Sequence, residues 1–126
     1  MNGLSEIYFR PKAFELNGRL YTWMGVLHFK NLLVQLARKD SKSKNGPSYL
    51  LADRSRTGIQ AFEKRTRRNE LIHLMGLLMS AVFLFMGFLI ITTMIVPGIL
   101  VLVVNFHSFI LQRYNRIRIY RLLSRL

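Results

Sequence analysis

The stretch "LIHLMGLLMSAVFLFMGFLIITTMIVPGILVLVVNFHSFILQ", residues 71–112, contains no Lys, Arg, Asp or Glu. One bilayer crossing takes about 20 consecutive apolar residues, so this run is long enough for two. Pro97 and Gly98 lie near its middle, and this pair is a turn signal at which a helix is expected to end or kink. The run therefore predicts an all-α membrane protein with a two-span helical hairpin, its spans at about 71–91 and 98–113.

The charged residues lie on both sides of this run. The chain has 126 residues, enough for one small domain, with 51% hydrophobic residues and a formal net charge of +13. All six acidic and fourteen of the nineteen basic residues precede residue 71, and the other five are Arg between 113 and 125. Because basic flanks stay on the cytoplasmic side, we expect a multi-pass membrane protein with both termini in the cytoplasm.

Several chemistries are excluded or disfavoured by what the sequence lacks. There is no cysteine, so neither a disulfide nor a thiolate metal site can form. The start "MNGLSEIYFRPK", residues 1–12, does not have the charge and hydropathy pattern of a signal peptide. No phosphate-binding glycine loop, nucleophile elbow or paired-histidine motif is present, so we expect neither soluble-enzyme chemistry nor a cofactor.

The sequence divides into three parts. Residues 1–37 include "RLYTWMGVLHFKNLLVQLA", 19–37, which predicts an amphipathic helix in the cytoplasmic interface because His28, Asn31 and Gln35 share one helical face. The alternative is a helix that packs on the hairpin without touching lipid. Residues 38–58 form a polar linker whose basic residues indicate a loop near anionic lipid rather than a nucleic-acid site.

The third part, residues 59–126, holds the hairpin and a basic tail. We expect a helix to begin near Ile59 and to run directly into the first span. In the tail, Arg118, Arg121 and Arg125 share one side of a helix and the apolar residues share the neighbouring side. This amphipathic C-terminal helix is expected to lie flat on the lipid headgroups.

A polar pair stands where the first span begins. Glu70 and His73 are three residues apart, so they lie on one helical face, where a carboxylate can orient an imidazole as a general base. The hairpin returns residues 112–116 to the same depth. Asn105 lies deeper in the second span and is expected to face protein, because an unpaired amide in hydrocarbon is costly. His107 should face the hairpin or the amphipathic helix.

Two other interpretations of this pair remain open. Glu70 could form an interfacial ion pair with Arg113 or Arg116 while His73 only caps the span. Alternatively, Glu70, His73 and His107 could bind a metal ion, although the sequence offers no evident fourth ligand.

Two stretches that flank the hairpin, "RTRRNELIH" at 65–73 and "NFHSFILQRYNRIRIYRLL" at 105–123, resemble a small bacterial enzyme family, the glycosyl-4,4'-diaponeurosporenoate acyltransferases of staphyloxanthin-type carotenoid synthesis. A weaker likeness lies upstream, in "GVLHFKNLL" at 25–33. The chain departs from the family pattern at Phe29, Leu33, Arg65 and His107, so we expect a divergent or N-terminally short member. The matching residues are Gly25, Val26, Lys30, Leu32, Thr66, Arg68, Glu70, His73, Asn105, Gln112, Arg113, Tyr114, Asn115, Arg116 and Arg118.

The resemblance implies transfer of a fatty acyl group to a hydroxyl of a glycosylated membrane lipid. It assigns His73 as the base oriented by Glu70, with Asn105, Arg113, Asn115 and Arg116 as further catalytic residues. Acyl-CoA or an acyl carrier protein would supply the acyl group. The residues expected to bind substrate are His28, Lys30, Arg68, Gln112, Tyr114 and Arg118.

A non-enzymatic function is the alternative: the chain could be a small subunit or scaffold of a larger bacterial membrane complex. A two-span hairpin encloses little volume, so even an acyltransferase of this size is expected to need a homo-oligomer or a partner to close its acyl groove.

Overall fold

The computed structural model describes residues 3–39, 51, 53–90 and 92–125, and all elements within these ranges are helical. Most of the predicted linker, residues 40–50 and 52, lies outside the described residues. The elements are α1 (Gly3–Phe9), a 3₁₀ turn η1 (Ala13–Glu15), α2 (Arg19–Trp23), α3 (Val26–Lys39), α4 (Arg56–Leu89), a 3₁₀ turn η2 (Thr92–Met94) and α5 (Ile95–Leu123). This agrees with the all-α fold class predicted from the sequence.

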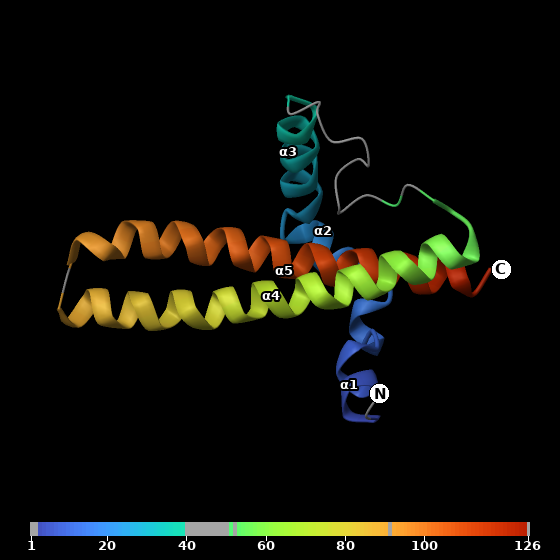
Figure 1. Cartoon of the computed structure of the whole chain (residues 1–126), viewed down its shortest axis with the longest axis horizontal. Coiled ribbons are helices and arrows are strands. Elements are labelled where there is room, and N and C mark those ends of the chain that lie inside the picture. The colour runs from blue at the N-terminus through green and yellow to red at the C-terminus, as the bar shows by residue number, and fades with distance from the viewer. Residues whose placement is uncertain (1–2, 40–50, 52, 91, 126) are drawn as a thin grey trace.

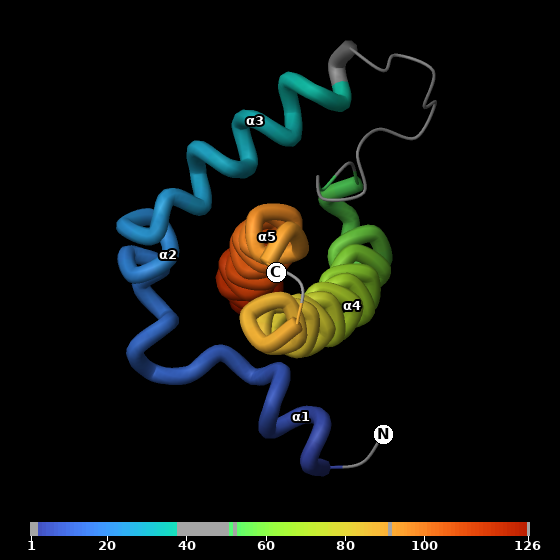
Figure 2. The backbone as a smooth tube through the Cα atoms, turned by 90° about the vertical axis from the view of Figure 1, so that its left-hand side faces the viewer, coloured from blue at the N-terminus to red at the C-terminus, as the bar shows by residue number. Residues whose placement is uncertain are grey.

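The long helices α4 and α5 form an antiparallel hairpin, and the N-terminal third of the chain wraps around one end of it. Figure 1 shows α4 and α5 side by side along the longest axis, with α1 on one side and α3 on the other. In Figure 2 the path from α1 through α2 to α3 curves around α5. The other end of the hairpin, toward η2, is not covered by the N-terminal helices.

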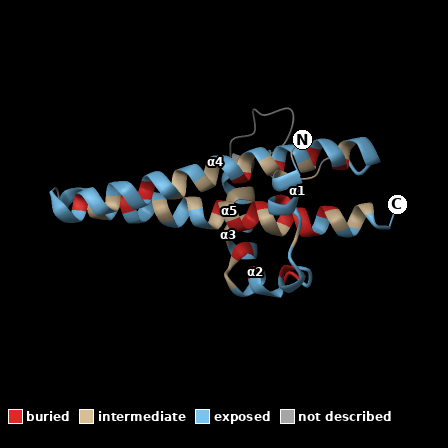
Figure 3. Cartoon of the chain, turned by 90° about the horizontal axis from the view of Figure 1, so that it is seen from below, coloured by how far each residue is buried: buried red, intermediate tan, exposed pale blue. Residues whose placement is uncertain are grey.

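Both hairpin helices are long and apolar enough to cross a membrane. The most apolar 18-residue window in each has a mean hydropathy of 2.2, and only 11% of it in α4 and 22% in the second helix is buried. Figure 3 shows the mostly exposed surface of the uncovered half of the hairpin. Exposed apolar surface of this length is typical of a lipid-facing helix pair rather than of a soluble core.

The hairpin turn lies slightly earlier in the chain than predicted. The first long helix ends at Leu89, and α5 already begins at Ile95. Pro97 is thus in the first turn of α5, where the backbone N–H that proline lacks would have no helical acceptor. Proline at this position starts the helix instead of ending one, so the structure corrects the expectation of a turn at Pro97 and Gly98.

The first long helix begins at Arg56, earlier than the expected start near Ile59. Ser55 explains the difference, because its side-chain oxygen accepts a hydrogen bond from the Gly58 N–H at 3.1 Å. The preceding Asp53 accepts from the Ser55 N–H at 2.8 Å and holds this cap in place. A serine N-cap satisfies one of the unpaired amides of the first turn.

The C-terminal tail is not a separate surface helix. The second long helix continues without a break to Leu123, and Ile119 is buried against Ile59 and Phe62 of α4. The tail is helical as predicted, but the expectation that it lies flat on the headgroups was wrong. Its apolar face, which the prediction placed on lipid, packs instead on the N-terminal part of α4.

The segment predicted as one helix, 19–37, is divided into α2 and α3. Gly25 lies at the break with φ of +79°, a left-handed conformation that a residue with a Cβ adopts only with strain. Beyond the break, Val26 is fully buried and Phe29 and Leu33 pack against α5. The predicted polar face, His28, Asn31 and Gln35, is exposed, so α3 is amphipathic as predicted, with its apolar face on the hairpin.

Candidate functional site

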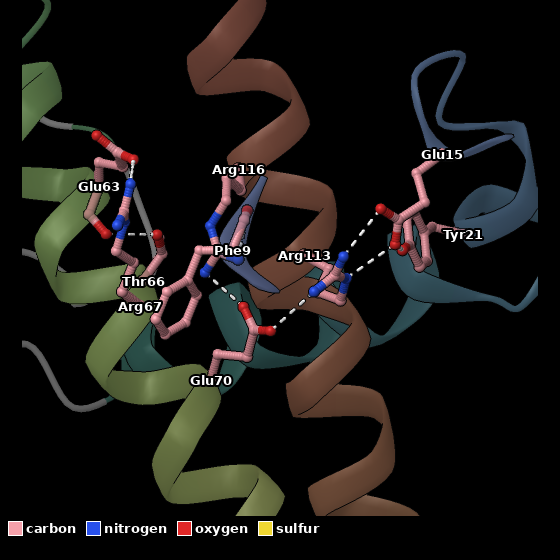
Figure 4. A network of polar contacts seen from close by, with 9 residues as sticks. All are labelled: Phe9, Glu15, Tyr21, Glu63, Thr66, Arg67, Glu70, Arg113 and Arg116. Atoms are coloured by element: carbon pink, nitrogen blue, oxygen red, sulfur yellow. Dashed lines mark hydrogen bonds and ion pairs between the residues drawn. The ribbon is translucent and has the colours of Figure 1, made fainter. Parts of the chain in front are cut away.

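Glu70 and Arg116 form a buried ion pair between α4 and α5. The side chain of Glu70 is 0% exposed and that of Arg116 is 1% exposed. One carboxylate oxygen of Glu70 faces Nη2 of Arg116, and the other accepts a hydrogen bond from Nη1 of Arg113 at 3.1 Å. Figure 4 shows both guanidinium groups converging on this carboxylate. Two arginines thus neutralise one buried acid, which needs such partners to remain charged.

Arg113 connects this pair to the N-terminal segment. Its Nε and Nη2 donate to the two carboxylate oxygens of Glu15 at 2.8 and 2.9 Å, a bidentate arrangement. The Tyr21 hydroxyl donates to the same carboxylate, and so does the Lys12 N–H at 2.6 Å. Burial disfavours the charged form, but the hydrogen bonds from Arg113, Lys12 and Tyr21 outweigh it and lower the pKa of Glu15 to about 2. Burial and the hydrogen bond to Glu15 raise the pKa of Tyr21 to about 12.

Phe9 completes the network from the other side of the hairpin. Its carbonyl accepts from Nη1 of Arg116 at 3.2 Å, and the Arg116 guanidinium lies 4.8 Å from the centre of the Phe9 ring. Arg67 lies 5.1 Å from the same ring and pairs with Glu6 and Glu63. These contacts, drawn in part in Figure 4, fix the N-terminal segment to both long helices. The network is therefore a scaffold that joins three parts of the chain.

His73, one turn beyond Glu70, interacts with a different residue. Its Nδ1 lies 3.2 Å from Oδ1 of Asn105, and Nδ2 of Asn105 donates to the Val101 carbonyl at 2.9 Å. Because a carbonyl can only accept, this second bond fixes the orientation of the amide and leaves Oδ1 as the acceptor for the ring. His73 must then carry its proton on Nδ1. In the neutral ring the lone pair is then on Nε2, where a general base needs it.

Gly76 makes room for this pair. It lies on the same face of α4 as His73, and a Cβ at this position would lie 2.6 Å from Cγ of Asn105, closer than real contacts allow. The next turn carries Ser80, which is buried and donates to the Gly76 carbonyl at 2.6 Å. His73, Gly76 and Asn105 therefore form a small polar site inside the apolar half of the hairpin.

The structure does not form the pairing predicted between Glu70 and His73. Both oxygens of Glu70 are directed to arginines, and among the described residues no hydrogen bond joins them to His73. The ion-pair interpretation of Glu70 agrees with this geometry. His107, the third member of the possible metal set, instead bonds the Val103 carbonyl of its own helix at 2.9 Å. Within the described ranges, no three His, Asp or Glu side chains are grouped to hold a metal ion.

The other predicted site residues are spread over several surroundings. Gln112 is buried, and its Oε1 has no hydrogen-bond partner among the described residues, while Tyr114 lies against Gly18. Arg68 and His28 are exposed, away from the polar site. Lys30, Asn115 and Arg118 line one pocket on the other side of α5's C-terminal half. The sequence analysis did not identify Glu15, Tyr21 and Phe9 as part of the network, because no local pattern marks them. It also did not identify Gly76, although the spacing of Gly76 from His73 could have indicated it.

The sequence model of one protein family, glycosyl-4,4'-diaponeurosporenoate acyltransferase, matches residues 5–125. This confirms the resemblance inferred from the two motifs that flank the hairpin. Comparisons with curated proteins and with solved structures found no match to this chain.

Proposed function

Because the chain belongs to the glycosyl-4,4'-diaponeurosporenoate acyltransferase family, we propose that it is an integral membrane enzyme that acylates a hydroxyl of a glycosylated membrane lipid. The family indicates an acyltransferase of carotenoid glycolipid synthesis, and a carotenoid glycoside is the acceptor that fits it best. The two apolar helices support a location in the bacterial inner membrane, with both termini in the cytoplasm.

The observation that carries this proposal is the hydrogen bond between His73 and Asn105. It leaves Nε2 of His73 free to take the proton of a sugar hydroxyl while the oxygen attacks the carbonyl carbon of an acyl thioester. When the tetrahedral intermediate collapses, the C–S bond breaks and the proton on Nε2 passes to the departing thiolate. The base is restored, and the reaction needs no cofactor. General-base catalysis of this kind contributes about 10²–10⁴-fold.

In this proposal Asn105 takes the orienting role that the resemblance gave to Glu70. An amide on Nδ1–H holds the ring in one tautomer, as a carboxylate would, and adds no charge inside the apolar hairpin. Glu70, Arg113 and Arg116 then hold the helices in register one turn away. They act on the chemistry through the position of His73.

Mass spectrometry of membrane lipids tests the function. The chain is expressed in bacteria that make the glycosylated carotenoid, beside the empty vector and His73→Gln. We expect an acylated glycolipid only with the unchanged chain. Equal acylated product with His73→Gln would remove His73 from the chemistry. Absence of any acylated lipid, with the protein abundant in the membrane, would favour the non-catalytic subunit instead.

A further inference from the structure

A pocket of about 320 Å³ is lined by residues of α3, α4 and α5. Figure 2 shows that α3 lies on the side of the hairpin opposite α1. The pocket lies along the proposed cytoplasmic half of the hairpin, farther from the η2 turn than the polar site is. No acidic residue is among its lining residues. Its walls combine three basic side chains and one amide with four apolar side chains: Lys30, Arg54, Arg118, Asn115, Leu51, Phe62, Ile119 and Leu122.

The amide in this wall has an unused donor. Asn115 is 3% exposed, and within the described residues its Nδ2 has no hydrogen-bond partner. A buried N–H group without an acceptor is unfavourable and uncommon in native proteins. The described residues therefore supply no acceptor to Asn115 where it borders the pocket.

The positive charges of the pocket also lack an acidic partner in the part of the chain that the structure describes. Neither Lys30 nor Arg118 forms an ion pair with another described residue. The nearby acids are engaged elsewhere, since Asp53 accepts from Ser55 and Glu63 from Arg67. Burial and the charge of Arg118 lower the pKa of Lys30, which is the direction expected when cations gather without a counter-charge.

We propose that this pocket binds the phosphate group of a ligand, with Lys30, Arg118 and Asn115 as its donors. A phosphate monoester carries nearly two negative charges and three acceptor oxygens, so it satisfies several cations and the unused N–H group together. A carboxylate offers one charge and two oxygens. The apolar wall formed by Phe62, Ile119 and Leu122 suits the carbon skeleton attached to the phosphate.

Under the proposed function, on which this step rests, the ligand is a phosphate-bearing acyl donor. Asn115 follows Asn105 by ten residues on α5, which is about 15 Å along the helix axis. A donor anchored at the pocket therefore needs an extended arm to bring its thioester to His73. A phospholipid headgroup has the same phosphate chemistry and is the other possible source.

Calorimetric titration of the full-length protein in an uncharged detergent distinguishes the sources. The probes are coenzyme A, as a soluble phosphate-bearing thiol carrier, and a short-chain phosphatidylglycerol. Arg118→Gln and Lys30→Gln should each weaken binding about tenfold, the loss expected for one hydrogen bond to a charged group. Arg125→Gln is the matched control, since this exposed arginine of the same chain end lies outside the pocket. Saturation by coenzyme A identifies the soluble donor, and saturation by the lipid alone identifies the headgroup.

Asn115→Leu separates binding from folding. It removes the unused donor at nearly constant volume, so the thermal midpoint without ligand should be unchanged or higher while binding weakens about tenfold. The proposal that the pocket binds phosphate would be overturned by either of two results. One is unaffected binding in Asn115→Leu and Arg118→Gln, and the other is no binding of either probe by the unchanged protein. Retained binding without acylated lipid in cells would instead refute the proposed function and leave the pocket standing.

Discussion

Nδ1 of His73 in α4 lies 3.2 Å from Oδ1 of Asn105 in α5, although the two residues are 32 positions apart in the sequence. The Val101 carbonyl fixes the amide, and the amide fixes the tautomer of the ring. Among the described residues, no carboxylate hydrogen bonds to His73, so Asn105 alone orients the ring and leaves the lone pair of the neutral imidazole on Nε2.

His73→Ala should lower the acyl-transfer rate by about 10²-fold or more, because the general base is lost. Asn105→Ala should also lower it, and the double variant should be little worse than His73→Ala alone, since residues that act as a unit are non-additive. His107→Ala is the matched control, because the His107 ring bonds the Val103 carbonyl of its own helix and contacts Phe29, not the His73–Asn105 pair. Rates are measured per molecule of folded protein in detergent. Additive losses in the double variant would show that Asn105 does not act through His73.

Gly76→Ala should disrupt the site by steric conflict. The new Cβ would overlap Asn105, so we expect a lower thermal midpoint and a lower rate. Gly87→Ala, in the same helix, meets its nearest neighbour at 3.4 Å and should be tolerated. Adding Asn105→Ala to Gly76→Ala should restore the thermal midpoint but not the rate. Normal activity of Gly76→Ala would mean that close packing of Asn105 is not required.

Glu70→Gln should mainly reduce the amount of folded protein. Removing the charge of one partner in a buried ion pair costs about 3–5 kcal/mol, because Arg116 then keeps a buried charge without a paired carboxylate among the described residues. The loss is measured as membrane abundance and as the thermal midpoint of the purified protein. Product should fall in proportion to folded protein. If Glu70→Gln has a normal thermal midpoint but makes no product, Glu70 takes part in catalysis and not only in folding.

Acid should destabilise the protein through Glu15. The folded state holds the pKa of Glu15 at about 2, below its ordinary value of 4.5. Its contribution to stability is therefore complete above about pH 4.5 and is lost as the pH falls toward 2. Thermal midpoints between pH 2 and 7 should drop more for the unchanged chain than for Glu15→Gln. Glu6→Gln is the control, since Glu6 forms an exposed pair of the kind that contributes little. Parallel pH curves for the unchanged chain and Glu15→Gln would contradict this assignment.

Membrane topology can be tested with single cysteines, because the chain has none of its own. Thr93→Cys lies in the hairpin turn and Ser124→Cys follows α5, and both positions are exposed. An impermeant thiol reagent should label residue 93 in intact spheroplasts and residue 124 only after permeabilisation. External labelling of residue 124 would place the C-terminus outside.

The hairpin could be predicted because an uncharged run of this length permits few other folds, and the helical face carrying His73 followed from spacing alone. The partner of His73 could not be predicted, because both Glu70 and Asn105 were within reach of its ring. The sequence suggested a pair between Glu70 and one arginine, but two arginines contact Glu70 in the structure. With both carboxylate oxygens occupied, the His73 ring bonds Asn105 instead. The role of Glu15 was also hidden, because its partner Arg113 lies 98 residues away and no periodic pattern connects them.

That separation determines the order in which the network can form during translation. Glu15 and Tyr21 leave the ribosome early, and Glu70 follows. The arginines that pair with the two acids, Glu15 and Glu70, are encoded near the end of the chain. The nascent chain therefore carries unpaired carboxylates until Arg113 and Arg116 are synthesised. A product that stops before them has an apolar hairpin with an uncompensated acid at its base.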